Sequence, residues 1–183
     1  MSEFLTRLDI GILFSLNSIA GRTAPLDGVI VFVAHYLPYV LPLILLVLVV
    51  RAGISSQEKI TIVIATILSV VIARGLLTEL IRAVYHRPRP FLTHDIVQLL
   101  PETSYSFPSG HATFFFAFAG ALYFYNKRWG IWFGIAALLI GIARVMSGVH
   151  YPSDIIAGAL IGILTAWAVV LCIRTFFTKT LTD

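Results

Sequence analysis

The sequence predicts an all-α protein, a polytopic transmembrane helical bundle that forms one domain over residues 1–183. Three observations support this fold class. The 183-residue chain is 58% hydrophobic and 12% charged, whereas soluble domains are about 45–50% apolar and about 25% charged. Its apolar residues are gathered in runs close to the ~20 residues that a helix needs to cross the hydrocarbon core. Only helices satisfy their own backbone polar groups inside such long runs.

The first segment, residues 4–20, is short, and its apolar residues recur every three or four positions. It is expected to be either an interfacial amphipathic helix or a short tilted span. Five further spans complete a six-helix core, at residues 29–50, 60–81, 111–125, 129–147 and 154–177. The span over 111–125 is short, and we expect it to extend back into the preceding loop or to sit shallow in the membrane.

The long polar connection over residues 82–110 is rich in Pro, Arg, His and Thr. Long loops in compact proteins are usually functional or disordered. Chemistry-bearing motifs lie at both ends of this loop and again beside the last two spans: Arg82 with Arg89-Pro90, Pro108 to His111, and Arg144 with His150 and Asp154. Because successive spans alternate in direction, all three motifs are expected at the same face of the membrane.

Three arginines, Arg82, Arg89 and Arg144, are expected to converge there. A guanidinium presents donors that match phosphate oxygens, and it stays charged at any relevant pH. Three unpaired guanidiniums would repel one another, so an anion is their expected partner. Ser109 and Gly110 lie where a helix begins, and free backbone N–H groups and the positive end of the helix dipole favour an anion there. We interpret these five residues as a substrate-phosphate-binding site.

Two histidines and an aspartate complete the candidate site. His150 and Asp154 suit a nucleophile and its orienting group, because a carboxylate bonded to one ring nitrogen leaves the other nitrogen free to attack. His111 is the expected general acid for the departing oxygen. These catalytic residues predict phosphoryl transfer to His150 and then hydrolysis of the phosphohistidine, with arginines stabilising the phosphoryl oxygens. The scheme requires no metal and no other cofactor.

The motifs resemble the three-part signature of the type 2 phosphatidic acid phosphatase superfamily, which includes bacterial lipid phosphatases and vanadium haloperoxidases. The family pattern is Lys-x6-Arg-Pro, then Pro-Ser-Gly-His, then Ser-Arg-x5-His-x3-Asp. The chain departs from it twice, because Arg82 replaces the lysine and Ala143 replaces the serine before Arg144. The first change keeps the charge and the second removes a hydroxyl. The signature spans residues 82–154, and the helical layout extends the resemblance over nearly the whole chain.

Within this family, the short chain, the tract over residues 26–42 and the spacing of residues 87–94 are similar to the bacitracin-resistance type of undecaprenyl-diphosphate phosphatase. The resemblance implies a phosphoric or diphosphoric monoester hydrolase that converts undecaprenyl diphosphate to undecaprenyl phosphate. Such an enzyme recycles the lipid carrier of peptidoglycan synthesis and so serves cell wall biogenesis. It also confers bacitracin resistance, because bacitracin sequesters the diphosphate.

The basic residues divide between the two ends of the spans. One end carries three basic pairs, Arg51 with Lys59, Lys127 with Arg128, and Arg174 with Lys179. The other end carries Arg22 and Arg87 together with the motif arginines. With the motif arginines set aside, the first end is the more basic, and basic short loops stay in the cytoplasm. We therefore expect a multi-pass protein of the bacterial cytoplasmic membrane with its active site on the extracytoplasmic face.

Several alternatives stay open. The signature recognises the phosphate and not the lipid tail, so phosphatidylglycerophosphate, phosphatidic acid and a lipid A phosphate are alternative substrates. A transporter that binds anionic headgroups without cleaving them is the alternative from another class, but it has no need of His150 with Asp154. The oligomeric state is open. The bilayer and a lipid (di)phosphate are the expected partners, and nucleic acid is not, because the net charge of +4 forms no basic run with interleaved aromatics.

Two other sets of residues need an interpretation. His86 and His94 follow no usual zinc spacing with the other histidines, and no cysteine assists them, so no metal site is predicted. Arg74 and Glu79 are charges within a span, where charges are costly and often functional. A structural ion pair is the favoured interpretation, and Glu79 is also placed to pair with an arginine of the site.

Overall fold

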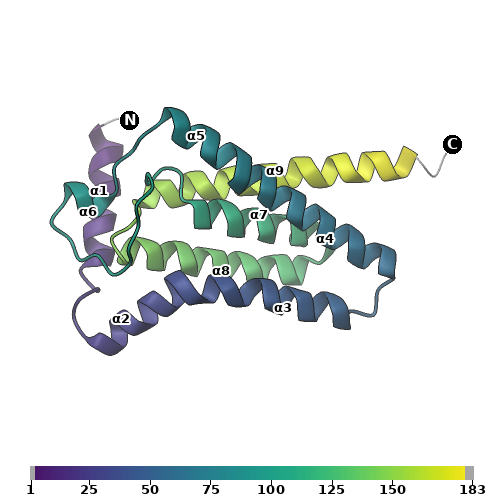
Figure 1. Cartoon of the computed structure of the whole chain (residues 1–183), viewed down its shortest axis with the longest axis horizontal. Helices are drawn as coiled ribbons and strands as arrows, with labels where there is room; N and C mark the ends of the chain where they lie inside the picture. Colours follow the sequence, from purple (N-terminus) through teal and green to yellow (C-terminus); the bar gives the residue numbers. More distant parts are fainter. Residues whose placement is uncertain (1–2, 180–183) are drawn as a thin grey trace.

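The computed structural model describes residues 3–179, with side chains described for residues 3–175, and it is helical along most of this length (Figure 1). This confirms the predicted fold class. The elements in chain order are α1 (Glu3–Asn17), α2 (Ala24–Val31), the π-helical turn η1 (Phe32–Tyr36), α3 (Leu37–Arg51), α4 (Ser56–Val70), the π-helical turn η2 (Val71–Leu77), α5 (Thr78–Val84), α6 (Pro90–Thr93), α7 (Gly110–Tyr125), α8 (Lys127–Met146) and α9 (Pro152–Lys179).

Each expected span corresponds to a helix or to a continuous helical rod. Helices α2, η1 and α3 join into one rod, and α4, η2 and α5 join into another. Four helical segments of the described chain are long and apolar enough to cross a membrane: 24–51, 56–84, 127–146 and 152–175. The fifth expected span, α7, is shorter at 16 residues. It begins at Gly110 and so does not extend back into the loop.

Helix α7 is nonetheless the centre of the bundle, lying between α8 and α9 with α4 beside it (Figure 1). Small residues allow this close packing. A Cβ atom added at Gly158 of α9 would come within 2.7 Å of the Ser109 carbonyl oxygen, and one at Gly162 within 2.6 Å of the Thr113 carbonyl oxygen. Small residues at helix contacts let backbones approach closely in membranes. These two glycines therefore serve the close packing of α9 on α7.

Helix α1 runs across the end of the bundle instead of along it (Figure 1). It buries one face through residues at helical spacing, Asp9, Leu13 and Asn17. Its other face exposes apolar side chains, including Phe4 and Leu8. This arrangement fits the interfacial amphipathic helix and not the tilted span. Because α1 lies against the end where the motif loops gather, its buried Asp9 contacts Arg87 and Ser153, beside the third motif.

Candidate active site

The three sequence motifs meet at the end of the bundle where α5 and α8 finish and where α7 and α9 begin (Figure 1). A pocket of about 360 Å³ opens there. Its charged and titratable lining consists of Arg74, Arg82, Arg89, Glu102, His111, Arg144 and His150. These residues come from three helical rods and from the loops before α6, after α6 and after α8, and they are brought to one cavity as the alternation of spans predicts.

The three predicted arginines are buried in this pocket, with side chains at most 9% exposed. Each of them donates to a backbone carbonyl oxygen, Arg144 to that of Ala34 at 3.4 Å. Arg82 donates to the carbonyl oxygen of Pro108 at 3.0 Å, and Arg89 donates to that of Val149 at 2.8 Å. The Nε atoms of Arg82 and Arg144 are buried without a hydrogen-bond partner among the described residues. Unpaired buried donors are costly, so these atoms point to an anionic ligand that the pocket is built to accept.

Glu102 is a member of the site that the sequence reasoning missed. Its carboxylate accepts from Arg89 at 3.1 Å and also pairs with Arg144. Burial alone would raise the pKa of Glu102, but the neighbouring Arg144 and Arg89 lower it below the ordinary value, so the carboxylate is ionised at neutral pH. Burial lowers the pKa of Arg89 to about 10 although Glu102 opposes the shift, and the guanidinium remains charged. Glu102 thus takes the position that a phosphate dianion needs.

Replacing Glu102 with glutamine is expected to tighten the binding of inorganic phosphate by roughly tenfold, equivalent to about 1.4 kcal/mol. The physical reason is that phosphate then meets two arginines with no competing carboxylate. The measurement is the dissociation constant of inorganic phosphate by titration calorimetry on the detergent-purified chain, with Glu3→Gln as the exposed control. Weaker binding of phosphate to Glu102→Gln would instead assign Glu102 to holding the arginines in place.

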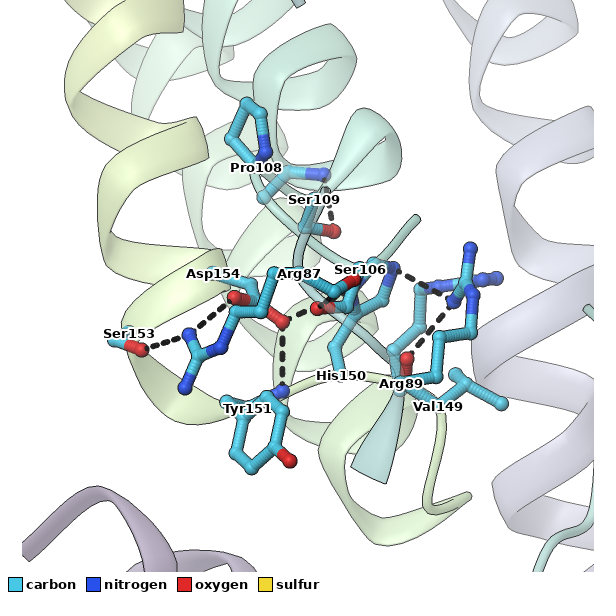
Figure 2. A network of polar contacts seen from close by, with 12 residues as sticks. Arg87, Arg89, Ser106, Pro108, Ser109, Val149, His150, Tyr151, Ser153 and Asp154 are labelled. Atoms are coloured by element: carbon cyan, nitrogen blue, oxygen red, sulfur yellow. Dashed lines mark hydrogen bonds and ion pairs between the residues drawn. The ribbon is translucent and has the colours of Figure 1, made fainter. Parts of the chain in front are cut away.

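His150 lies between Arg89 and Asp154 (Figure 2). Its Nε2 atom is 3.5 Å from Nη1 of Arg89, and its Nδ1 atom is 3.4 Å from Oδ2 of Asp154. Burial, together with the adjacent Arg144 and Arg89, lowers the pKa of His150 well below its usual value. The imidazole is therefore neutral at physiological pH. Nε2 faces the arginines and Nδ1 faces the carboxylate, the orientation that a nucleophile and its orienting group require.

Asp154 is held by a polar network that reaches α1. The sequence reasoning did not predict this network. Arg87 donates from Nη1 to Asp154 at 2.6 Å and from Nη2 to Asp9 at 2.8 Å (Figure 2 shows the Asp154 side). Asp9 also accepts from the backbone N–H of Ser153 at 2.8 Å. The guanidinium lies 3.8 Å from the centre of the Tyr151 ring. Burial alone would lower the pKa of Arg87, but Asp154 and Asp9 raise it. The one sequence signal was the position of Arg87 two residues before Arg89.

The Pro-Ser-Gly-His motif forms the start of α7. Ser109 is its N-cap and accepts from the N–H of Ala112 at 3.4 Å. The backbone N–H of Ser109 donates to the Asp154 carbonyl oxygen at 3.0 Å, and the residue is fully buried. The structure therefore places Ser109 behind the pocket and not in its lining. Gly110 and His111 do line the pocket, so the backbone groups available to a ligand begin at Gly110.

The remaining candidates lie as follows. Among residues 3–175 no three His, Cys, Asp or Glu side chains gather into a group that could hold a metal ion. The His86 ring packs on Tyr105, and the His94 ring contacts Tyr151. Arg74 pairs with Glu79, which confirms the predicted ion pair, and Glu79 also lies 3.8 Å from Nη1 of Arg82.

The chain resembles known proteins in sequence and in fold. Residues 63–178 match the family model described as the PAP2 superfamily. The chain is 31% identical to the bacitracin transport permease protein BcrC of Bacillus licheniformis, over 88% of this chain and 78% of that protein. It is also 31% identical to the undecaprenyl-diphosphatase BcrC of Bacillus subtilis (strain 168), over 82% of this chain and 76% of that protein. The crystal structure of LpxE from Aquifex aeolicus is similar with a TM-score of 0.73 and 29% identity, covering 89% of this chain and 94% of that one.

Proposed function

Since the chain belongs to the PAP2 superfamily of membrane lipid phosphatases, we propose that it removes the terminal phosphate of undecaprenyl diphosphate through a phosphohistidine intermediate. The observation that carries this proposal is the position of the His150 Nε2 atom. It faces a pocket in which Arg82, Arg89 and Arg144 are buried, and its Nδ1 atom faces Asp154.

In the first step, Nε2 of His150 attacks the terminal phosphorus. An N–P bond forms while the bond from phosphorus to the bridging oxygen breaks. The three arginines stabilise the charge on the equatorial oxygens. His111, which lines the same pocket and enters this step in its protonated form, gives that proton to the bridging oxygen, and undecaprenyl phosphate leaves. Asp154 keeps the His150 tautomer in which Nδ1 carries the proton and Nε2 the lone pair.

In the second step, water attacks the phosphohistidine. His111, now neutral, accepts a proton from that water as general base. The new oxygen–phosphorus bond forms, the N–P bond breaks, and inorganic phosphate leaves with His150 neutral again. Proton and phosphate both balance over the cycle without an external cofactor.

A lipid substrate is supported by the apolar part of the pocket lining. Besides the arginines, the lining includes Pro38, Tyr39, Pro42, Phe114 and Phe115. Such side chains suit a hydrocarbon tail that enters from the bilayer. The isoprenoid diphosphate in particular is favoured by the relative that is named undecaprenyl-diphosphatase. The relative that is named a transport permease keeps the transporter as the alternative, but His150 oriented by Asp154 favours catalysis over binding alone.

The proposed site of action is the extracytoplasmic face of the bacterial cytoplasmic membrane. The end of the bundle opposite the pocket carries Arg51, Lys59, Lys127 and Arg128 at the helix ends beside its short loops, and basic short loops stay in the cytoplasm. An enzyme with this orientation would return undecaprenyl phosphate to peptidoglycan synthesis and would remove the diphosphate that bacitracin sequesters.

The test is phosphate release by the detergent-purified chain in excess EDTA. Undecaprenyl diphosphate, phosphatidylglycerophosphate, phosphatidic acid and a lipid A phosphate are offered in parallel. Release from the isoprenoid diphosphate above the others is expected, because it alone of the four is a diphosphate and so offers two linked phosphates to a pocket lined by four arginines. A preference for a glycerolipid or lipid A phosphate would contradict the substrate assignment but would leave the proposed mechanism unchanged. Absence of release from all four would favour the transporter.

A further inference from the structure

The pocket contains a fourth arginine, Arg74, that none of the three motifs includes. Its guanidinium lies directly over Gly110. A Cβ atom added to that glycine would stand 2.5 Å from Nε of Arg74 and 3.1 Å from Cζ. The absence of a side chain at Gly110 therefore leaves room for Arg74 beside the first residue of α7. A cation here lies next to the backbone groups of Gly110 and His111 that open the pocket.

The π-helical turn η2 brings Arg74 to this position. Eight residues separate Arg74 from Arg82, and in a regular α-helix they make about 2.2 turns, which leaves the two side chains about 80° apart. A π turn holds an extra residue, and here the N–H of Thr78 bonds the carbonyl of Ala73, five residues back. With this extra residue, the eight positions from Arg74 to Arg82 make close to two full helical turns, so the two side chains lie on the same face of the rod. Both guanidiniums consequently line one pocket, and π turns recur at functional sites.

Arg74 differs from the other three arginines in exposure and in partner. Its side chain is 36% exposed, against 9% for Arg82 and 2% each for Arg89 and Arg144. Its partner Glu79 is itself 53% exposed. Arg74 therefore lies at the mouth of the pocket, where it can meet a ligand by exchanging one ion pair. A charge within a membrane span is costly to insert and is commonly functional.

We propose that Arg74, beside Gly110, binds the phosphate that stays on the lipid, and that this contact makes the chain select lipid diphosphates over lipid monophosphates. This inference rests on the proposed function. The buried arginines hold the terminal phosphate against His150. The second phosphate of a bound diphosphate must therefore extend from this site towards the mouth of the pocket. Arg74 is the remaining arginine in the pocket lining. It also stabilises the negative charge that the leaving phosphate gains as the bridging bond breaks. A monophosphate lacks that second anion and gains nothing from Arg74.

The test compares farnesyl diphosphate with farnesyl monophosphate, which share one tail, as substrates of the detergent-purified chain. Arg74→Gln is expected to lower kcat/KM for the diphosphate by roughly 10- to 100-fold, the size of a lost charge-assisted contact. The monophosphate should change by less than about threefold, as when only screened surface charge is altered. Arg74→Lys should retain part of the preference because it keeps the charge. Arg51→Gln, exposed at the far end of α3, is the matched control.

Equal losses on both substrates, or no loss on either, would overturn the proposal. A binding measurement separates this outcome from failure of the proposed function. In the His150→Ala chain, thermal stabilisation by inorganic diphosphate and by inorganic phosphate needs no turnover. Adding Arg74→Gln to this chain should weaken the thermal stabilisation by inorganic diphosphate and should not change the stabilisation by inorganic phosphate. If the binding of both anions is unaffected by Arg74→Gln, the subsite is absent whatever the chain hydrolyses.

Discussion

Replacing His150 with alanine is expected to lower kcat by roughly 10⁴- to 10⁶-fold, the loss seen when the nucleophile of an oriented catalytic unit is removed. The imidazole is 1% exposed, its Nδ1 atom faces Asp154 and its Nε2 atom faces the pocket, so alanine at this position leaves no nucleophile where the phosphate binds. The measurement is single-turnover phosphate release from undecaprenyl diphosphate. His94→Ala is the matched control, because His94 lies in the polar loop of the same end and contacts the Tyr151 ring.

The same variant tests the covalent intermediate. Substrate labelled with ³²P in its terminal phosphate should leave label on the protein after an alkaline quench, because phosphohistidine survives base and is lost in acid. His150→Ala should carry no label, and His94→Ala should carry as much as the parent chain. Label that persists in His150→Ala would assign the nucleophile to another residue, and unimpaired turnover in that variant would contradict the mechanism itself.

Replacing Arg87 with glutamine is expected to destabilise the fold by about 3–5 kcal/mol, because two buried carboxylates lose their shared cation. Asp154 and Asp9 are 0% and 5% exposed, so water does not replace the lost ion pairs. For a chain of this size the loss corresponds to roughly 10 °C in Tm. Turnover should fall as well, since Asp154 loses the contact that holds it beside His150. The measurement is the thermal unfolding midpoint in detergent together with kcat.

A double-mutant cycle separates the network from a general loss of charge. Asp9→Asn combined with Arg87→Gln should cost less than the sum of the single changes, since each single change leaves a charge without its partner. Arg22→Gln is the control, because Arg22 lies at the same end of the molecule and is exposed. Additive losses, or an Arg87→Gln chain as stable as Arg22→Gln, would show that Arg87 does not couple α1 to Asp154.

The helices and the gathering of the three motifs were predictable from the sequence. Runs of apolar residues specify membrane helices through local physics, because each helix satisfies its own backbone groups. Alternation of the spans then brings Arg82, Arg89, Arg144 and His150 to one end without any knowledge of packing. Helix boundaries shifted by up to five residues, as in the rod over 24–51 that was expected at 29–50. End residues differ most because polar residues near a helix end are compatible with either state.

Only the tertiary structure decided which polar atoms meet. Asp9 and Arg87 are 78 residues apart in the chain, and Glu102 and Arg144 are 42 apart. No local sequence pattern predicts either pair, because a lone acid in an amphipathic helix or in a loop is ordinarily solvated. Their pairing depends on distances of a few ångströms that the packing of whole helices sets.

The same limit explains Ser109 and Arg74. The sequence placed Ser109 at a helix start, but the approach of α9 determined that its N–H bonds the Asp154 carbonyl and faces away from the pocket. The π turn that carries Arg74 over Gly110 adds one residue to a helix without a signal in its composition. Sequence alone thus determined the fold class and the chemistry of the motifs, because both follow from local hydrophobicity and residue type. Tertiary packing decided the partners of each charge, because electrostatic contacts form only between groups that the folded chain brings together and shields from water.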